Sequence, residues 1–214
     1  MLKIVNKPYP HIYIENYLPE LFKNQIIGNL PERCHFKKNN GSTFFYELNI
    51  MEEKNKILYS LIEIIYNDLF VKGQKIFNPF LKQKLIEIEK LENKKISSFK
   101  IEVEKHPYIS IAPIGQLIEA HRDSYFYHFN ILIYLGNLDG TKTQTTELLY
   151  VDENLTDDYI KKNENKFEAL NYGESSNSIL FFHNNSRSYH RVKDIINKER
   201  LTVFAGAYLN CEFI

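Results

Sequence analysis

A histidine and an aspartate stand two residues apart in the segment "EAHRDSYFYHFNILIYL", just ahead of an apolar run that is typical of a buried strand. His121 and Asp123 could form a polar surface turn, or a capping aspartate beside a buried histidine. They could also bind one metal ion together, because imidazole nitrogens and carboxylate oxygens are ligands of divalent transition metals. Taken alone, the pair favours the surface turn.

Residues later in the chain change this balance. Two imidazoles and one carboxylate suit ferrous iron that must keep coordination positions open. The third ligand would be His183 in "LFFHNNS" or His190 in "SYHRVKD", and Arg200 follows His190 by ten residues, with Thr202 two further on. An arginine can bind a carboxylate through two parallel hydrogen bonds, and a neighbouring hydroxyl can add a third. The spacing to Arg200 favours His190, and we expect His183 to be structural or to line the pocket.

The ordered set of motifs resembles the Fe(II)- and 2-oxoglutarate-dependent dioxygenases, specifically their prolyl-hydroxylase-like branch. The matching segments are "HRD", "IYLGN", "TTELLYV", "NYGESSNSILFF", "YHRV" and "RLT", and the opening "KPYPHIYIENYLPE" is also similar to the start of such proteins. Two departures leave the substrate side of the pocket open. The chain has "TTEL" where the family has a "GGEL"-like strand, and residues 151–172 form a long charged loop.

The resemblance implies a role for six residues. The iron ligands would be His121, Asp123 and His190. Arg200 would bind the C5 carboxylate of 2-oxoglutarate with help from Thr202, and Tyr134 would contact the same co-substrate. The implied reaction uses Fe(II), 2-oxoglutarate and O2, hydroxylates an unactivated carbon of a protein residue or small metabolite, and releases succinate and CO2.

Two other classes of protein remain open at this point. One is a cupin-like metal-dependent isomerase or sugar-binding module that has the same barrel but does not use 2-oxoglutarate. The other is a catalytically inactive relative that acts as a binding protein. Neither needs both Asp123 and Arg200 at these positions. We expect the arginines that flank the proposed ligands to be exposed to solvent; they are Arg122, Arg187 and Arg191.

Composition narrows the possible partners and the compartment. The 214 residues are 43% hydrophobic and 25% charged, which is ordinary for a globular protein. The 27 basic and 27 acidic residues balance, so nothing favours a nucleic-acid or anionic-membrane partner. Cys34 and Cys211 are far apart, and we find no signal peptide and no 18-residue apolar run. We therefore expect a cytoplasmic location, while the oligomeric state stays undetermined.

The first 96 residues are predicted to form a mixed α/β region that supports the β core. A strand is expected over residues 10–15, a helix over 18–30 opened by Pro19, and another strand over 42–49. A strongly amphipathic helix is expected over 52–70 and ended by Gly73, with its buried face formed by Ile57, Leu61, Ile64, Ile65 and Leu69. A further helix begins at Asn78-Pro79, although the alternation in "IEIEK" leaves a strand open there.

From about residue 97 the chain predicts short strands. They are expected over residues 98–105, 108–114, 116–121, 128–135, 145–151, 166–170, 178–182, 188–195 and 200–209. Many short strands separated by turn signals are typical of a sandwich or barrel. We therefore predict a mainly β (α+β) protein, and the resemblance implies a double-stranded β-helix, or jelly roll, supported by N-terminal helices. Residues 1–214 are expected to form one domain, with residues 97–214 as its core.

Overall fold

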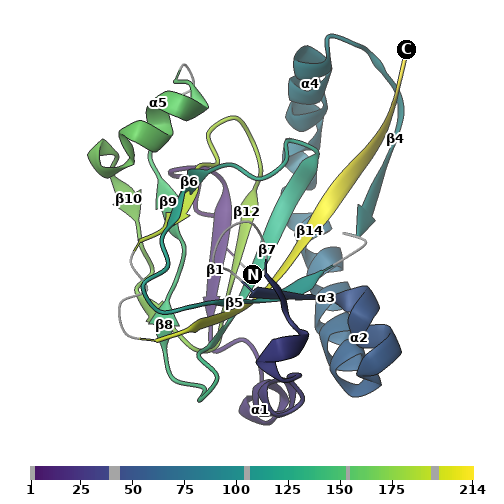
Figure 1. The fold of residues 1–214 in the computed structure, drawn as a ribbon. Coiled ribbons are helices and arrows are strands. Elements are labelled where there is room, and N and C mark those ends of the chain that lie inside the picture. Colours follow the sequence, from purple (N-terminus) through teal and green to yellow (C-terminus); the bar gives the residue numbers. More distant parts are fainter. Residues whose placement is uncertain (1–2, 39–43, 104–106, 153–154, 194–197) are drawn as a thin grey trace.

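The computed structural model describes residues 3–38, 44–103, 107–152, 155–193 and 198–214. Those residues form a mainly β structure with 14 strands, all paired antiparallel, and a few helices (Figure 1). The mainly β prediction is therefore confirmed. None of the helices in these residues is long and apolar enough to cross a membrane.

The larger sheet has eight strands. Its strand order is β1 (His11–Glu15), β12 (Ser178–His183), β7 (Tyr127–Gly136), β14 (Arg200–Phe213), β5 (Tyr108–Ala112), β3 (Phe44–Glu47) and β2 (Lys37–Lys38), and β4 (Ile96–Val103) also pairs with β14. The long strand β14 thus bridges two groups of partners, because its first half pairs with β5 and β7 and its second half with β4.

The smaller sheet has four strands. Its order is β10 (Ala169–Leu170), β9 (Glu147–Leu149), β13 (His190–Val192) and β6 (Ile118–His121), and a separate pair joins β8 (Thr143–Gln144) to β11 (Glu174–Ser175). Leu148 of β9 packs with Leu132, Leu180 and Phe204 of the larger sheet, so the two sheets share an apolar layer.

Alternation along the strands of the larger sheet gives it two different faces. On β7, Leu132 and Tyr134 face the smaller sheet, whereas Ile131 and Ile133 belong to the main core on the opposite face. This is the two-residue period of a pleated strand. The strand is buried on both faces, which explains the continuous apolar run "ILIYL".

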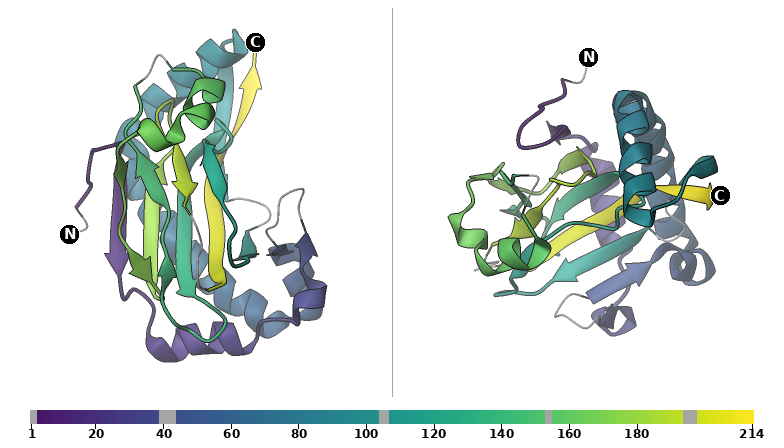
Figure 2. Two further views of the ribbon diagram at one scale, coloured as in Figure 1. Left: turned by 60° about the vertical axis from the view of Figure 1, so that its left-hand side comes forward. Right: turned by 90° about the horizontal axis from the view of Figure 1, so that it is seen from above.

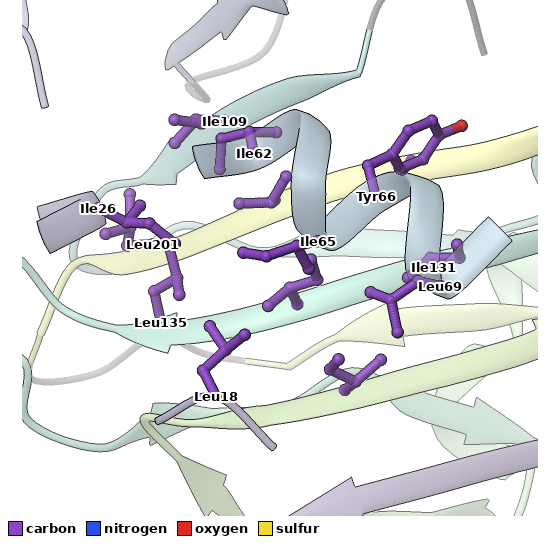
Figure 3. Close-up of a cluster of buried hydrophobic side chains, with 14 of the residues drawn as sticks. Leu18, Ile26, Ile62, Ile65, Tyr66, Leu69, Ile109, Ile131, Leu135 and Leu201 are labelled. Carbon is purple, nitrogen blue, oxygen red and sulfur yellow. The ribbon is translucent and has the colours of Figure 1, made fainter. Parts of the chain in front are cut away.

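Helices cover the face of the larger sheet that lies away from the smaller sheet (Figure 2). They are α1 (Glu20–Gly28), α2 (Leu48–Lys54) and α3 (Lys56–Phe77). The 3-10 turn η1 (Arg33–His35) follows α1, and the turn η2 (Asn78–Phe80) joins α3 to α4 (Leu81–Glu92). Figure 3 shows how α3 packs its side chains against Ile131, Leu135 and Leu201 of the sheet. The helix predicted from Asn78-Pro79 is present, so the strand alternative there is wrong.

The buried face predicted for the helix over residues 52–70, most of which is α3, is partly wrong. Ile57 and Ile64 are 62% and 61% exposed, and the apolar side chains that α3 buries are Leu58, Ile62, Ile65, Tyr66, Leu69 and Phe77. Aliphatic residues lie on both sides of this buried face, so the sequence was compatible with more than one buried face for the helix. The observed face also includes the polar residue Tyr66, whose hydroxyl donates to the carbonyl of Gly206.

Gly73 does not end α3, which continues to Phe77. It lies on the buried face, where an added Cβ would stand 2.4 Å from Cε2 of Phe129 on β7. Phe129 in turn packs against the rings of Phe70 and Phe77. The glycine therefore permits the close approach of α3 to the sheet.

Two other predicted segments differ in detail. Only residues 44–47 of the expected strand 42–49 are a strand; 42–43 lie outside the described residues, and α2 begins at Leu48. The expected loop 151–172 contains α5 (Asp157–Lys162) and the turn η3 (Glu164–Lys166). Thr156 caps α5, and Ile160 packs on the smaller sheet through Leu149. The ends of the expected strands 98–105 and 188–195, residues 104–105 and 194–195, fall outside the described ranges.

Gly73→Ala is expected to destabilise the protein by up to about 2 kcal/mol, because the cost of overpacking exceeds the gain in helix propensity. The gain in helix propensity is about 1 kcal/mol, but overpacking a closed core costs roughly 1–3 kcal/mol, and the trapped Phe129 ring has no room to move. Urea denaturation gives the free energy of unfolding. Gly28→Ala is the control, because nothing lies within 4 Å of an added Cβ there. An equal effect of both substitutions would contradict the close-approach argument.

Candidate active site

The pairing of β6 with β13 brings two histidines together. His121 and His190 are register partners across the two antiparallel strands, and their ring centroids are 4.3 Å apart. Asp123 follows β6 in the next turn. One of its carboxylate oxygens lies 3.5 Å from Nε2 of His190, and the other lies 3.9 Å from Nε2 of His121. One potential ligand atom from each of the three residues lies within 4.8 Å of the others.

Backbone carbonyls orient both imidazole rings. Nδ1 of His121 bonds to the carbonyl of Glu119 at 2.8 Å, and Nδ1 of His190 bonds to that of Ser188 at 3.1 Å. A carbonyl only accepts, so each Nδ1 carries a proton, and in the neutral form of either ring the lone pair is on Nε2. Burial, and secondly His121, lower the pKa of His190 to about 4, which keeps this ring neutral at physiological pH.

This donor set fits a divalent transition metal. Metal–ligand bonds of about 2.0–2.2 Å place ligand atoms roughly 3–3.5 Å apart, close to the two contacts of Asp123. Two neutral imidazoles and a carboxylate on one side of an ion form the facial triad of non-heme Fe(II) sites, which leaves positions open for other ligands. The three predicted ligand residues therefore lie where a metal site requires them.

Asn130 on β7 holds Asp123 in place. Its side-chain amide is fully buried and donates to the Asp123 carboxylate at 2.7 Å. The opposite position on β14 is Gly206, where an added Cβ would lie 3.1 Å from the Asn130 amide oxygen. Asn130 was not among the residues predicted from the sequence. The available signal was a polar residue inside the otherwise apolar run "HFNILIYL".

His183 lies apart from this triad, at the end of β12. Its ring is buried and contacts the rings of Phe77, Phe80 and His128. Burial lowers the pKa of His183 to about 2, so the ring is neutral. Among the described residues, the ligand group includes His190 and does not include His183. The geometry thus supports the predicted choice between the two histidines.

A cavity of about 830 Å³ extends from the triad across the inner face of the larger sheet. This volume is within the range of small-molecule sites, about 300–1,000 Å³. Polar lining residues include Ser110, Thr146, Arg200 and Thr202, and apolar ones include Phe45, Tyr108, Leu132 and Phe204. One space therefore contains both the triad and the predicted arginine.

Arg200 opens β14 and is only 4% exposed. Its Nη2 donates to the hydroxyl of Thr146 at 2.8 Å, and its Cζ lies 5.3 Å from the centre of the Tyr134 ring. Its Nε has no hydrogen-bond partner, and no described carboxylate lies within 4 Å of the guanidinium. A buried guanidinium without an acidic partner is costly unless an anion binds it. Arg200 therefore fits the carboxylate of an organic acid.

Thr202 and Tyr134, the other two residues predicted to contact the co-substrate, differ in whether they line the cavity. Thr202 lines the cavity, and its hydroxyl shares a 2.7 Å hydrogen bond with that of Ser110. Tyr134 is fully buried behind Arg200, and its hydroxyl accepts from the backbone N–H of Thr146. A direct contact of Tyr134 with a co-substrate stays a prediction. Thr146 is the second residue of "TTEL", where the family has a "GGEL"-like strand. Its hydroxyl accepts a hydrogen bond from Arg200, which a glycine at this position could not do.

The flanking arginines differ from one another. Arg187 is exposed, as expected. Arg191 is buried, so the expectation is wrong there: its guanidinium donates to Glu147 at 2.7 Å and to the carbonyl of Glu164. Arg122 is exposed, as expected, and donates to Asp157 at 2.8 Å. These contacts tie β9, β13 and the α5 segment together around the triad.

Similar solved structures were found, whereas no protein-family model and no curated protein sequence matches the chain. A prolyl hydroxylase from Trichoplax adhaerens, in complex with a hypoxia inducible factor peptide fragment, has a TM-score of 0.59 and 14% identity, covering 92% of this chain and 83% of its own. A Pseudomonas putida prolyl-4-hydroxylase has a TM-score of 0.58 and 11% identity, covering 92% and 91%.

The chain shares the fold of the prolyl hydroxylases. The resemblance predicted from the sequence is confirmed at this level. The non-heme alpha ketoglutarate dependent carbocyclase SnoK from nogalamycin biosynthesis has a TM-score of 0.58 and 6% identity, covering 92% of this chain and 79% of its own. The fold therefore carries more than one reaction outcome, and the chemistry of this chain must be argued from its own site.

Replacing any one residue of the triad by alanine is expected to abolish binding of a divalent metal. A site with three protein ligands has no spare donor. Isothermal titration with Co²⁺ on His121→Ala, Asp123→Ala and His190→Ala measures this. His183→Ala is the control and should keep metal binding. Loss of binding in His183→Ala together with retention in His190→Ala would contradict the ligand set.

Asn130→Leu is expected to weaken metal binding by about 10- to 100-fold, the usual effect of removing a group that orients a ligand. Leucine keeps the buried volume but cannot donate to Asp123. The same titration with Co²⁺ gives the affinity. Asn210→Leu, an exposed position on β14, is the control. A wild-type affinity in folded Asn130→Leu would show that Asp123 needs no such support.

Proposed function

We propose that the chain is an Fe(II)- and 2-oxoglutarate-dependent dioxygenase built on a double-stranded β-helix formed by its two sheets, within one domain of residues 1–214. The reaction converts 2-oxoglutarate, O2 and a substrate C–H group into succinate, CO2 and a hydroxylated carbon. The observation that carries the proposal is the position of Arg200. An unpaired, buried guanidinium lines the same cavity as the metal-binding triad.

Each part of the site has a defined task under this proposal. His121, Asp123 and His190 would hold the iron, which when bound supplies the open positions and redox chemistry for 2-oxoglutarate and O2. Arg200 would form a charge-assisted hydrogen bond to the distal carboxylate, with Thr202 beside it. The buried inner sheet face excludes water around this ion pair, which strengthens it.

Two neighbouring side chains hold Asp123 and Arg200 in position for binding the metal and 2-oxoglutarate. Asn130 donates to one Asp123 oxygen, which keeps the carboxylate turned toward the two rings. Tyr134 lies behind the guanidinium of Arg200 and limits its movement. Because the arginine is already desolvated in the folded chain, the co-substrate meets a preorganised cation, and less ordering is needed on binding.

The open half of the cavity would receive the substrate. Phe45 and Glu47 of β3 and Tyr108 of β5 line the same cavity as the triad. The Trichoplax adhaerens neighbour is described in complex with a peptide, and SnoK is described as a carbocyclase. A protein residue and a small metabolite therefore both remain substrate classes for this chain. A cupin-like isomerase or sugar-binding module is less well supported, because neither needs a buried unpaired Arg200.

Arg200→Ala is expected to weaken 2-oxoglutarate binding while leaving the metal in place. Losing one partner of a desolvated charge pair costs about 2–5 kcal/mol, or roughly 30- to several-thousand-fold in affinity. Fe(II) is added without oxygen, and 2-oxoglutarate is then titrated in. The weak visible charge-transfer band, which requires both components, reports the affinity for 2-oxoglutarate. Succinate release on admitting oxygen gives an independent readout.

Lys198→Ala is the matched control, since it removes an exposed cation two residues earlier. It should leave the titration unchanged. Failure of the wild-type chain to give the band with both components would reject the proposed class. An unchanged 2-oxoglutarate affinity in folded Arg200→Ala would reject the assignment of Arg200.

A further inference from the structure

A second cavity, of about 530 Å³, lies beside the triad. It is lined by residues of α4, of the turn after β6, of α5 and of the turn between β12 and β13, and Asp123 borders both cavities. Figure 1 shows α4 and α5 at the same end of the sheets. This end contains a buried cation that the proposed reaction does not use.

Lys84 of α4 lines this cavity and is only 1% exposed. Within the described ranges, no carboxylate lies within 4 Å of its ammonium group, and the group makes no hydrogen bond. The other buried lysine, Lys23, has an ion pair with Glu20 at 2.7 Å. A buried ammonium without a partner is strongly unfavourable. Its position at a cavity wall gives it access to a partner from outside the chain.

The neighbouring groups do not supply the missing charge. Arg122 and Asp157 bond to each other at 2.8 Å, so they neutralise one another. Two buried histidines close to Lys84, His128 and His183, stay neutral because burial lowers their pKa to about 4 and about 2. Glu87 also lines this cavity, and its charge only partly offsets the lowering of the Lys84 pKa by burial. The cation of Lys84 therefore has no dedicated counter-ion.

The other polar groups of the wall suit an anion of several oxygens. Ser124, Asn185 and Ser186 line the cavity beside Lys84 and offer hydroxyl and amide groups. An ammonium presents three donors and binds phosphate as a point charge. The volume exceeds that of a single oxyanion, so the anionic group can belong to a larger molecule.

We propose that this cavity binds an oxyanion group, a phosphate or a carboxylate, through the ammonium of Lys84. Neither of the two triad histidines nor Arg200 lines this cavity, so the anion site does not depend on the proposed reaction. Because Asp123 borders it, an anion bound there lies next to the turn that carries a proposed metal ligand.

The test is titration of the full chain with inorganic phosphate, and separately with acetate, at pH 7.5 and constant ionic strength set with NaCl. We expect a saturable rise in Tm with at least one of the two anions, and the same in Lys82→Met, which removes an exposed cation of the same helix. Lys84→Met should lose that response. A response to phosphate alone assigns a phosphate group, and one to acetate alone assigns a carboxylate.

Lys84→Met should bind Co²⁺ as the wild type does, and His190→Ala should keep the anion response, which separates this site from the metal centre. Absence of a wild-type response to both anions, or an equal response in Lys84→Met, would overturn the proposal.

Labelling gives a second measurement that needs no variant. Cyanate adds to an unprotonated amine to form a urea, and burial lowers the pKa of Lys84 to about 8. Saturating anion should slow carbamoylation of Lys84 at least several-fold, and an unchanged rate would also overturn the proposal.

Discussion

The antiparallel pairing of β6 with β13 is the constraint on which the candidate active site depends. It places His121 directly across from His190, although 69 residues separate them in the chain. A slip of one residue would turn His190 to the other face of the small sheet. The pairing is held from outside by Glu164, whose carboxylate accepts from the backbone N–H of Ala120 and whose carbonyl accepts from Arg191. The turn η3, which follows α5, thus contacts both strands that carry the histidines.

The larger sheet supplies the rest of the site through its alternation. Arg200, Thr202 and Phe204 of β14 line the cavity, whereas Leu201 and Val203 belong to the helix-covered core. One strand therefore stabilises the fold with one set of side chains and binds ligands with the other. Gly206 continues this alternation, and its lack of a side chain leaves room for the ring of Tyr127 and the amide of Asn130.

Much of this arrangement could be predicted from the sequence, and the rest depends on contacts that sequence patterns do not contain. The strands and the ligand residues follow from local alternation and an ordered set of motifs. The partner of Arg200 could not be found in this way, because Thr146 lies 54 residues away and meets it only across the folded sheets. The buried face of α3 was not predicted correctly because aliphatic residues flank it on both sides, and no sequence pattern predicted that Lys84 is buried.

Arg200 and Lys84 illustrate one physical rule on two sides of Asp123. Each is a cation that folding removes from water without an acidic partner among the described residues. Such a group lowers the stability of the free chain, and an anion that binds only the folded state returns this stability. Both side chains border cavities instead of being enclosed by protein. The fold fixes the positions of these cations, and a buried cation without a counter-ion favours an anionic ligand.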